Sequence, residues 1–163
     1  RSGASTVIGV DRFRNRLDVG AALGADESIC LEDGPSVDVM SKLTNGAMAD
    51  IVIEAVGHGE LALDTSIDLV RKEGTILAFG VVDTEYVDRF PLGKAFYKNL
   101  TIKNTVGAKD EGDFLAAADM IANREVDLKP LITHTLPFEE AQRAYELFVD
   151  REDGAIKVVI DFE

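Results

Sequence analysis

The sequence has few of the features that define secreted or membrane proteins. It contains one cysteine, Cys30, no tryptophan and four prolines among 163 residues. A lone cysteine excludes an internal disulfide framework and is typical of a reducing compartment, so we expect a cytoplasmic protein. No apolar run approaches the ~18 residues that a membrane span requires. No secretory signal is evident either, although a missing N-terminus would have removed any targeting segment too.

Positive charge is also scarce, because 17 Lys and Arg face 30 Asp and Glu and give a net charge of −13. Such a surface repels nucleic acids and anionic membranes, so both are excluded as expected partners. A hydrophobic fraction of 46% with 29% charged residues predicts a globular domain with a sizeable core. We find no internal repeat and no second boundary, so residues 1–163 are expected to form one domain.

Patterns for metal binding or nucleophilic catalysis are missing. His58 and His134 lie far apart without partners at ligand spacing, and Cys30 falls within a predicted strand. A G-x-S-x-G nucleophile elbow is absent, although Ser-His-Asp or Cys-His catalysis stays open on sequence alone. A G-x-G-x-x-G phosphate loop is absent as well. We therefore expect no metal ligands in this chain.

What the sequence does contain is an alternation of strand and helix patterns. Apolar periodicity predicts strands at 7–10, 25–31, 50–56 and 75–79, with helices at 12–23, 37–43 and 60–70 between them. Lys72, Glu73 and Gly74 are expected to turn the chain before the fourth strand. This alternation predicts an α/β fold, a doubly wound parallel sheet with helices on both faces and right-handed crossovers.

The second half of the chain continues the pattern less regularly. Pro91 is predicted to open a helix that ends at Lys98, and Leu100–Val106 to form an edge strand. Extended segments are expected at 132–136 and 155–162. Two helices are predicted from their apolar faces, one formed by Phe114, Leu115, Ala118, Ile121 and Ala122, the other turning Phe138, Ala141, Tyr145 and Phe148 inward.

The first strand ends in a carboxylate, Asp11, directly before a helix. The second strand of a dinucleotide-binding unit ends this way, and its acid accepts hydrogen bonds from the ribose hydroxyls of the adenosine half. From this strand alone, a role of Asp11 in capping the following helix is as well supported as a role in ribose binding. In such units the phosphate loop lies about 20 residues before the acid, whereas only ten residues precede Asp11 here. Unless this interpretation is wrong, we expect the first strand and the loop to be missing.

Glycines follow two further strands, in Ala55-Val56-Gly57 and in Phe79-Gly80-Val81. Ligands of open parallel sheets lie beyond the carboxyl ends of the strands, where glycine lets the backbone approach a flat ring. For each glycine alone a simple chain turn is the commoner role. Two of them in adjacent units, together with Asp11, favour a nucleotide crevice.

Three arginines, Arg12, Arg14 and Arg16, cluster after the acid. One of them is placed to stack on adenine or approach a phosphate, and arginines here also suit the 2′-phosphate of NADP. Asp11 opposes NADP because a carboxylate beside a phosphate is electrostatically unfavourable, so NAD is favoured. The alternative is a solvated basic turn, which is the favoured interpretation for Arg14.

Two segments resemble a known family, ADIVIEAVGHGELALDTSIDLVRKEGTILAFGV at 49–81 and PLITHTLPFEEAQRAYELFVDREDGAIKVVIDF at 130–162. They are similar to the carboxyl-terminal part of zinc-type medium-chain alcohol and polyol dehydrogenases, which include alcohol, sorbitol and threonine dehydrogenases. The resemblance covers essentially the whole chain, and the second segment is the more specific. It implies a Rossmann-like NAD-binding domain, truncated before its first strand and glycine-rich loop.

The resemblance implies a role for each matching residue. Asp11 matches the ribose-binding acid, Arg16 a basic residue near the adenosine, and Lys157 a basic residue that approaches the pyrophosphate. The segment that lines the cofactor after the fourth strand is matched by Ala55, Val56 and Gly57, with His58 following, and the segment beside the nicotinamide by Phe79, Gly80 and Val81. Thr101–Val106 matches the edge strand through which family members dimerise, so a homo-oligomer is expected.

The resemblance also implies what this chain lacks. The zinc-ligating Cys, His and Glu belong to a GroES-like catalytic domain that is absent here, so zinc is expected only there and no turnover from this chain alone. In such enzymes zinc polarises the substrate oxygen while a hydride passes to the nicotinamide. The parent is thus expected to oxidise a small-molecule alcohol or polyol with NAD. A non-catalytic nucleotide-binding or interaction module and a zinc-independent quinone-reductase-like relative stay open as alternatives.

The missing strand has a physical consequence, since it lies at the centre of the usual 3-2-1-4-5-6 sheet order. Its loss leaves a slot between Thr6–Val10 and Asp50–Ala55. Backbone groups buried there without partners cost about 1–3 kcal/mol each. We expect the slot to be closed by strand rearrangement or filled by a strand from another chain.

Overall fold

A computed structural model describes residues 3–57, 60–82, 85–86, 89–105, 107–108 and 110–162. His58, which follows one predicted cofactor segment, and Val106, at the end of the predicted edge strand, lie outside the described residues. The chain divides into two compact units, one formed by residues 1–32 with 111–163 and the other by residues 33–110. The first unit is therefore built from both ends of the chain.

The first unit begins with a parallel β-α-β motif of β1 (Ile8–Asp11), α1 (Arg14–Ala22) and β2 (Glu27–Cys30). The α1 helix buries Leu17, whose Cδ2 would lie 3.6 Å from a Cβ added to Gly9. Gly24 ends the helix as predicted, with a φ of 103° that few other residues adopt. The motif thus places Asp11 at the carboxyl end of a parallel strand.

The same unit contains α5 (Glu111–Ala122), β6 (Ile132–Pro137), α6 (Ala141–Asp150) and β7 (Lys157–Asp161), with short 3-10 turns η1 (Lys129–Leu131), η2 (Phe138–Glu140) and η3 (Glu152–Gly154). The β6 and β7 strands pair in parallel, with His134 opposite Val158. Pro137 precedes the helical turn that leads into α6, as its fixed φ predicts. A second β-α-β motif therefore closes the chain.

The apolar faces of these helices correct one prediction. Ala144 and Leu147 are the buried residues of α6, whereas Phe138, Tyr145 and Phe148 are exposed and Ala141 is only half-buried, so the predicted inward face was wrong. The two stripes are adjacent on the helix, and the smaller side chains allow α6 to pack closely against β6 and β7. The residues of the predicted apolar face of α5 lie on one side of the helix, but none of them is buried.

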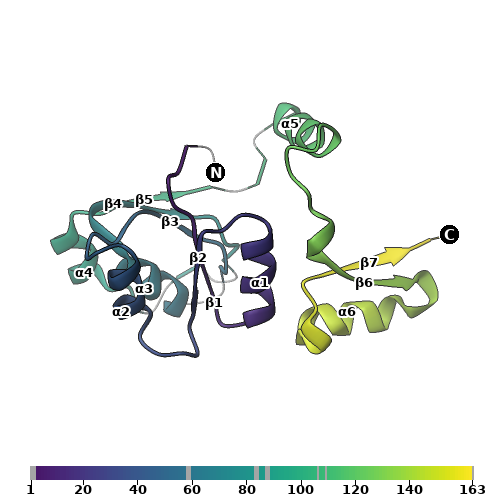
Figure 1. Ribbon diagram of the computed structural model, residues 1–163, viewed down its shortest axis with the longest axis horizontal. Helices are drawn as coiled ribbons and strands as arrows, with labels where there is room; N and C mark the ends of the chain where they lie inside the picture. The colour runs from purple at the N-terminus through teal and green to yellow at the C-terminus, as the bar shows by residue number, and fades with distance from the viewer. Residues whose placement is uncertain are drawn as a thin grey trace. The chain divides into compact units, whose positions relative to one another are not determined.

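The second unit is a parallel sheet in the order β3-β4-β5, formed by β3 (Ala49–Glu54), β4 (Val70–Ala78) and β5 (Thr101–Asn104). The edge position predicted for β5 is confirmed. The helices are α2 (Ser36–Leu43), α3 (Glu60–Leu69) and α4 (Leu92–Lys98). On the face of the sheet covered by α3 and α4, the core residues are Ile67, Val70, Ile76 and Ala95 (Figure 1).

The β4 strand begins earlier than predicted. Val70 already pairs with Ala49, and the ladder resumes at Ile51 opposite Thr75, so the predicted turn at Lys72–Gly74 is an irregularity within the strand. Glu73 retains a turn-like φ of 59°. The longer pairing is held by Arg71, whose Nε donates to Asp50 Oδ1 at 2.7 Å, a contact that local sequence patterns do not reveal.

Every strand pairing in the described chain is parallel, and each paired couple is linked through a helix, which confirms the α/β class. The predicted single sheet is instead three sheets, β1-β2, β3-β4-β5 and β6-β7. Among the described strands, β1 pairs only with β2 and β3 only with β4. Closure of the slot, by strand rearrangement or by a strand from another chain, stays a prediction.

Candidate functional site

Asp11 uses its two carboxylate oxygens differently. Oδ1 accepts a hydrogen bond from the backbone N–H of Phe13 at 2.9 Å, which satisfies an amide at the start of α1. Oδ2 lies 4.0 Å from Arg16 Nη1, and the Asp11 side chain is 30% exposed. One oxygen therefore holds the strand-to-helix turn, and the other retains acceptor capacity for the hydroxyl groups of a ligand.

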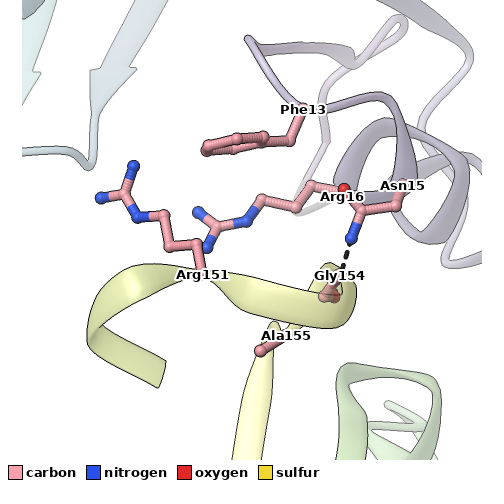
Figure 2. A pocket seen from close by; sticks show the side chains of 6 residues that line it. All are labelled: Phe13, Asn15, Arg16, Arg151, Gly154 and Ala155. Atoms are coloured by element: carbon pink, nitrogen blue, oxygen red, sulfur yellow. Dashed lines mark hydrogen bonds between the residues drawn. The ribbon is translucent and has the colours of Figure 1, made fainter. Parts of the chain in front are cut away.

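A pocket of about 230 Å³ opens beside the start of α1, and its lining residues are Phe13, Asn15, Arg16, Arg151, Gly154 and Ala155 (Figure 2). We call it the Phe13 pocket. Asn15 Nδ2 donates to the Gly154 carbonyl at 2.8 Å and so joins α1 to η3. Of the lining residues, sequence reasoning selected only Arg16. Arg151, Gly154 and Ala155 come from the other end of the chain, and no local pattern marks Phe13 and Asn15 as lining residues.

Three guanidinium groups surround the Phe13 ring. The Cζ atoms of Arg12, Arg16 and Arg151 lie 4.6, 5.2 and 5.5 Å from the ring centroid. Contact with the negative ring face offsets part of the repulsion between the cations. Figure 2 shows the guanidinium ends of Arg16 and Arg151 on the same side of the pocket. Their N–H groups make this pocket locally basic on an acidic protein, which suits an anionic or hydroxyl-bearing ligand.

Lys157 belongs to the same unit but not to the pocket lining. It opens β7 two residues after Ala155, its side chain is exposed, and its carbonyl accepts a hydrogen bond from Thr133 Oγ1 at 3.2 Å. The structure thus groups Asp11 with Arg16 and sets Lys157 on the strand that follows the pocket.

The predicted segments 55–57 and 79–81 lie in the other unit and meet at Glu54, which sequence reasoning missed. Glu54 Oε1 accepts the N–H groups of Val56 at 2.6 Å and Gly57 at 2.8 Å. The Glu54 carbonyl accepts the N–H groups of Phe79 and Gly80, both at 2.8 Å. Glu54 is 8% exposed, and its charge inside the apolar run IVIEAV is the signal that marks it.

Gly57 and Gly80 let the two segments touch. A Cβ added to Gly57 would overlap the backbone of Gly80 and Val81, and a Cβ on Gly80 would overlap Gly57. Gly57 also has a φ of 78°. The glycines therefore serve backbone-to-backbone packing in addition to any approach of a ligand. Ala55, Val56, Phe79 and Val81 stay exposed around them.

In the part of the chain that the structure describes, no three His, Cys, Asp or Glu side chains are grouped to hold a metal ion. His134 contacts Thr133 and Asp153 instead, and Cys30 is buried with its Sγ 3.5 Å from the Arg12 carbonyl. The helices of the described residues are too short or too polar to cross a membrane.

Residues 1–123 match the family model described as zinc-binding dehydrogenase. The chain is 28% identical to L-threonine 3-dehydrogenase of Bacillus licheniformis, over 97% of this chain and 45% of that protein. It is 29% identical to sorbitol dehydrogenase 1 of Saccharomyces cerevisiae, with the same coverage of 97% and 45%. The structure of alcohol dehydrogenase from Thermus sp. ATN1 superposes with a TM-score of 0.85 at 34% identity, covering 99% of this chain and 45% of that one. The chain spans less than half the length of these relatives.

Proposed function

Because the chain belongs to the zinc-binding dehydrogenase family, we propose that it is the cofactor-binding part of an NAD-dependent dehydrogenase of alcohols or polyols. The observation that carries the proposal is Asp11, a carboxylate whose side chain is 30% exposed at the carboxyl end of a parallel strand, with one oxygen left for ligand hydroxyls. Relatives named for threonine, alcohols and sorbitol support a small hydroxyl compound as the substrate. Residues 1–163 would then serve as one cofactor-binding domain.

Each half of the cofactor has its own group of residues in this proposal. Asp11 accepts the ribose hydroxyls of the adenosine half, Arg16 and the Phe13 pocket hold its adjacent polar groups, and Lys157 serves the pyrophosphate. At the nicotinamide half, the lining residues are Ala55, Val56, Gly57, Phe79, Gly80 and Val81. Asp11 disfavours NADP because its carboxylate would face the 2′-phosphate.

Bound NAD would supply the hydride acceptor, and the residues of this chain would bind and orient it. The described residues offer no ligand set for zinc, so a catalytic zinc is proposed only for the part of the parent protein outside this chain. No turnover is expected from residues 1–163 alone. A second copy of the chain is proposed as a partner at the β5 edge.

Calorimetric titration with NAD, NADP and ADP-ribose tests the cofactor assignment. We expect NAD to bind more tightly than NADP, and Asp11→Ala to weaken NAD and ADP-ribose binding about tenfold, since a charged hydrogen-bond acceptor is lost. Asp18→Ala, an exposed acid on the following helix α1, is the matched control and should leave binding unchanged. Equal NAD affinity of wild type and Asp11→Ala would contradict the proposal.

A further inference from the structure

Arg16 and Arg151 bring two guanidinium groups into the Phe13 pocket from opposite ends of the chain. Arg16 lies on α1, and Arg151 directly follows the last residue of α6. Their Cζ atoms lie 5.2 and 5.5 Å from the centroid of the Phe13 ring, and Figure 2 shows both groups on the same side of the pocket. Two positive charges held this close to one ring repel each other, and an anion bound to both would remove that repulsion.

Arg151 is not neutralised by the carboxylates beside it. The next two residues are acids, but Glu152 pairs with Arg143 Nη2 at 2.8 Å, and Asp153 Oδ2 lies 3.3 Å from His134 Nε2. Among the described residues, no carboxylate forms an ion pair with Arg151. Acids outnumber Lys and Arg by 30 to 17 in this chain, so the fold, and not a shortage of acids, leaves this guanidinium unpaired. Its N–H donors are therefore available to a ligand.

Arg16 also keeps donors for a ligand. Its contact with Asp11, 4.0 Å between Nη1 and Oδ2, is longer than a hydrogen bond, and the first turn of α1 contains no acidic residue. The Arg16 side chain is 28% exposed, so a ligand can reach it. A guanidinium group carries five N–H donors in a planar fork that fits the oxygens of a phosphate group. The pair of arginines therefore suits an anion with several oxygens.

The elements that carry the two arginines are joined by a hydrogen bond that does not use the arginine side chains. Asn15 of α1 donates from Nδ2 to the Gly154 carbonyl of η3 at 2.8 Å. A Cβ at Gly154 would lie 3.2 Å from the same Nδ2, so glycine leaves room for this contact. Arg151 has a φ of 56°, a left-handed conformation that persists in a non-glycine residue only where surrounding contacts impose it. Both arginines are thus positioned before a ligand arrives, which reduces the entropic cost of binding.

We propose that Arg16 and Arg151 form a subsite in the Phe13 pocket for a free divalent oxyanion of the phosphate class. The subsite itself depends on the two arginines, and one consequence rests on the proposed function: the free oxyanion competes with the adenosine half of the cofactor for this pocket. The anion is free and not part of NADP, because Asp11 disfavours a phosphate on the ribose that it binds. Cofactor binding thus weakens as the concentration of free phosphate rises.

Titration of the full chain with inorganic phosphate, followed by the nuclear magnetic resonance signals of the arginine Nε–H groups, tests the subsite. Sodium chloride at the same ionic strength is the control for screening. We expect phosphate, and not chloride, to shift the signals of Arg16 and Arg151, with a dissociation constant on the order of 1 mM. Arg151→Gln should weaken phosphate binding about tenfold, and Arg151→Lys about threefold, since lysine keeps the charge but lacks the planar fork.

Arg124→Gln is the matched control for the loss of one positive charge. Arg124 belongs to the same unit, is exposed, and has nearly the same backbone conformation as Arg151, with a φ of 58°. It does not line the Phe13 pocket, so this variant should bind phosphate as wild type does. Circular dichroism verifies that each variant is folded, and the wild-type comparison of phosphate with chloride needs no variant. Equal weakening by Arg124→Gln and Arg151→Gln, or signal shifts that chloride reproduces, would overturn the proposal.

Calorimetry with ADP-ribose separates the subsite from the proposed function. In phosphate at about twice its dissociation constant, ADP-ribose should bind about threefold more weakly than in sodium chloride of the same ionic strength, as competition for one pocket requires. An ADP-ribose affinity that phosphate leaves unchanged would contradict the competition. If wild type binds phosphate at Arg16 and Arg151 but does not bind ADP-ribose, the proposed function fails and the oxyanion subsite stands.

Discussion

At the scale of single residues, Glu54 joins the segments 55–57 and 79–81 through its side chain and its backbone carbonyl. One side-chain oxygen and one carbonyl receive four backbone N–H groups, two from each segment proposed to line the nicotinamide half. Because Glu54 and Gly57 are both buried, the amide of Gly57 has little access to replacement water. Glu54 therefore fixes the two segments against each other without having to touch a ligand.

Removing the Glu54 side chain should thus cost stability. We expect Glu54→Ala to lower the free energy of unfolding by about 2–4 kcal/mol, since two amides lose their acceptor. Glu54→Gln keeps an oxygen at the same position and should cost under about 1 kcal/mol. Urea unfolding followed by circular dichroism measures both. An alanine variant as stable as wild type would mean that other groups satisfy these amides.

Individual site residues could be predicted from sequence only where their signal is local. Asp11 follows an apolar strand and precedes a helix, which is visible in a short window. Asn15 and Gly154 form a direct hydrogen bond across 139 positions, and no local pattern indicates it. The positions of Arg151 and Asp153 depend on left-handed backbone conformations, which their residue types do not predict.

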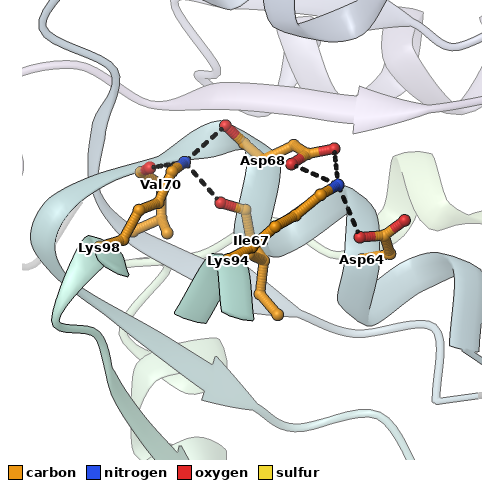
Figure 3. Close-up of polar contacts among 6 residues, drawn as sticks. All are labelled: Asp64, Ile67, Asp68, Val70, Lys94 and Lys98. Atoms are coloured by element: carbon orange, nitrogen blue, oxygen red, sulfur yellow. Dashed lines mark hydrogen bonds and ion pairs between the residues drawn. The ribbon is translucent and has the colours of Figure 1, made fainter. Parts of the chain in front are cut away.

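At the scale of elements, α3 and α4 are joined by two lysines whose pKa values are shifted in opposite directions (Figure 3). Lys98 Nζ donates to the carbonyls of Ile67, Asp68 and Val70 at 2.7, 3.1 and 2.8 Å and so caps the end of α3. Lys94 Nζ bridges Asp64 and Asp68 at 3.0 and 2.9 Å. Burial lowers the pKa of Lys98, whereas hydrogen bonds to Asp68 and Asp64 raise the pKa of Lys94.

These shifts predict the alkaline behaviour of the fold. The raised pKa of Lys94 gives stability that is complete below its ordinary value of 10.5 and is lost as pH rises through the folded value. The lowered pKa of Lys98 has the opposite sign, so stability recovers between its folded value and 10.5. Denaturant unfolding at a series of pH values measures both effects. Lys94→Met should abolish the loss of stability above pH 10.5, and Lys98→Met should abolish the rise in stability below pH 10.5. Unchanged profiles in both variants would contradict the assignment.

The order and type of the elements were predicted better than the helix faces that are buried. The strand and helix order follows from periodicity and from punctuation such as Gly24 and Pro91, because both act within one turn of chain. The buried face of α6 was not predictable in this way. Two adjacent apolar stripes run along it, and contacts with β6 and β7 decide that the one with Ala144 and Leu147 is covered.

At the scale of the whole molecule, the free edge of β5 is where a second copy is proposed to pair. Thr105 N–H donates to the Ala78 carbonyl at 3.3 Å. Since N–H groups alternate in direction along a strand, the N–H of Asn104 points away from β4. Asn104 is exposed, so this donor is available to another strand.

Asn104→Pro should therefore convert the proposed dimer to a monomer, because proline removes the outward donor without disturbing the inner ladder. Asn104→Ala keeps the donor and should remain dimeric. Size-exclusion chromatography with light scattering distinguishes the two states. A dimer that survives the proline substitution would place the contact elsewhere.

The division of the first unit between residues 1–32 and 111–163 has a consequence for biosynthesis. Unit 33–110 is continuous and leaves the ribosome as a complete set of partners, whereas β1, α1 and β2 emerge long before η3. With 139 positions between Asn15 and Gly154, translation at roughly 5–20 residues per second separates these partners by on the order of ten seconds. During that interval the nascent chain carries the complete β-α-β motif without the rest of its unit, so the Phe13 pocket cannot form until Ala155 has been synthesised.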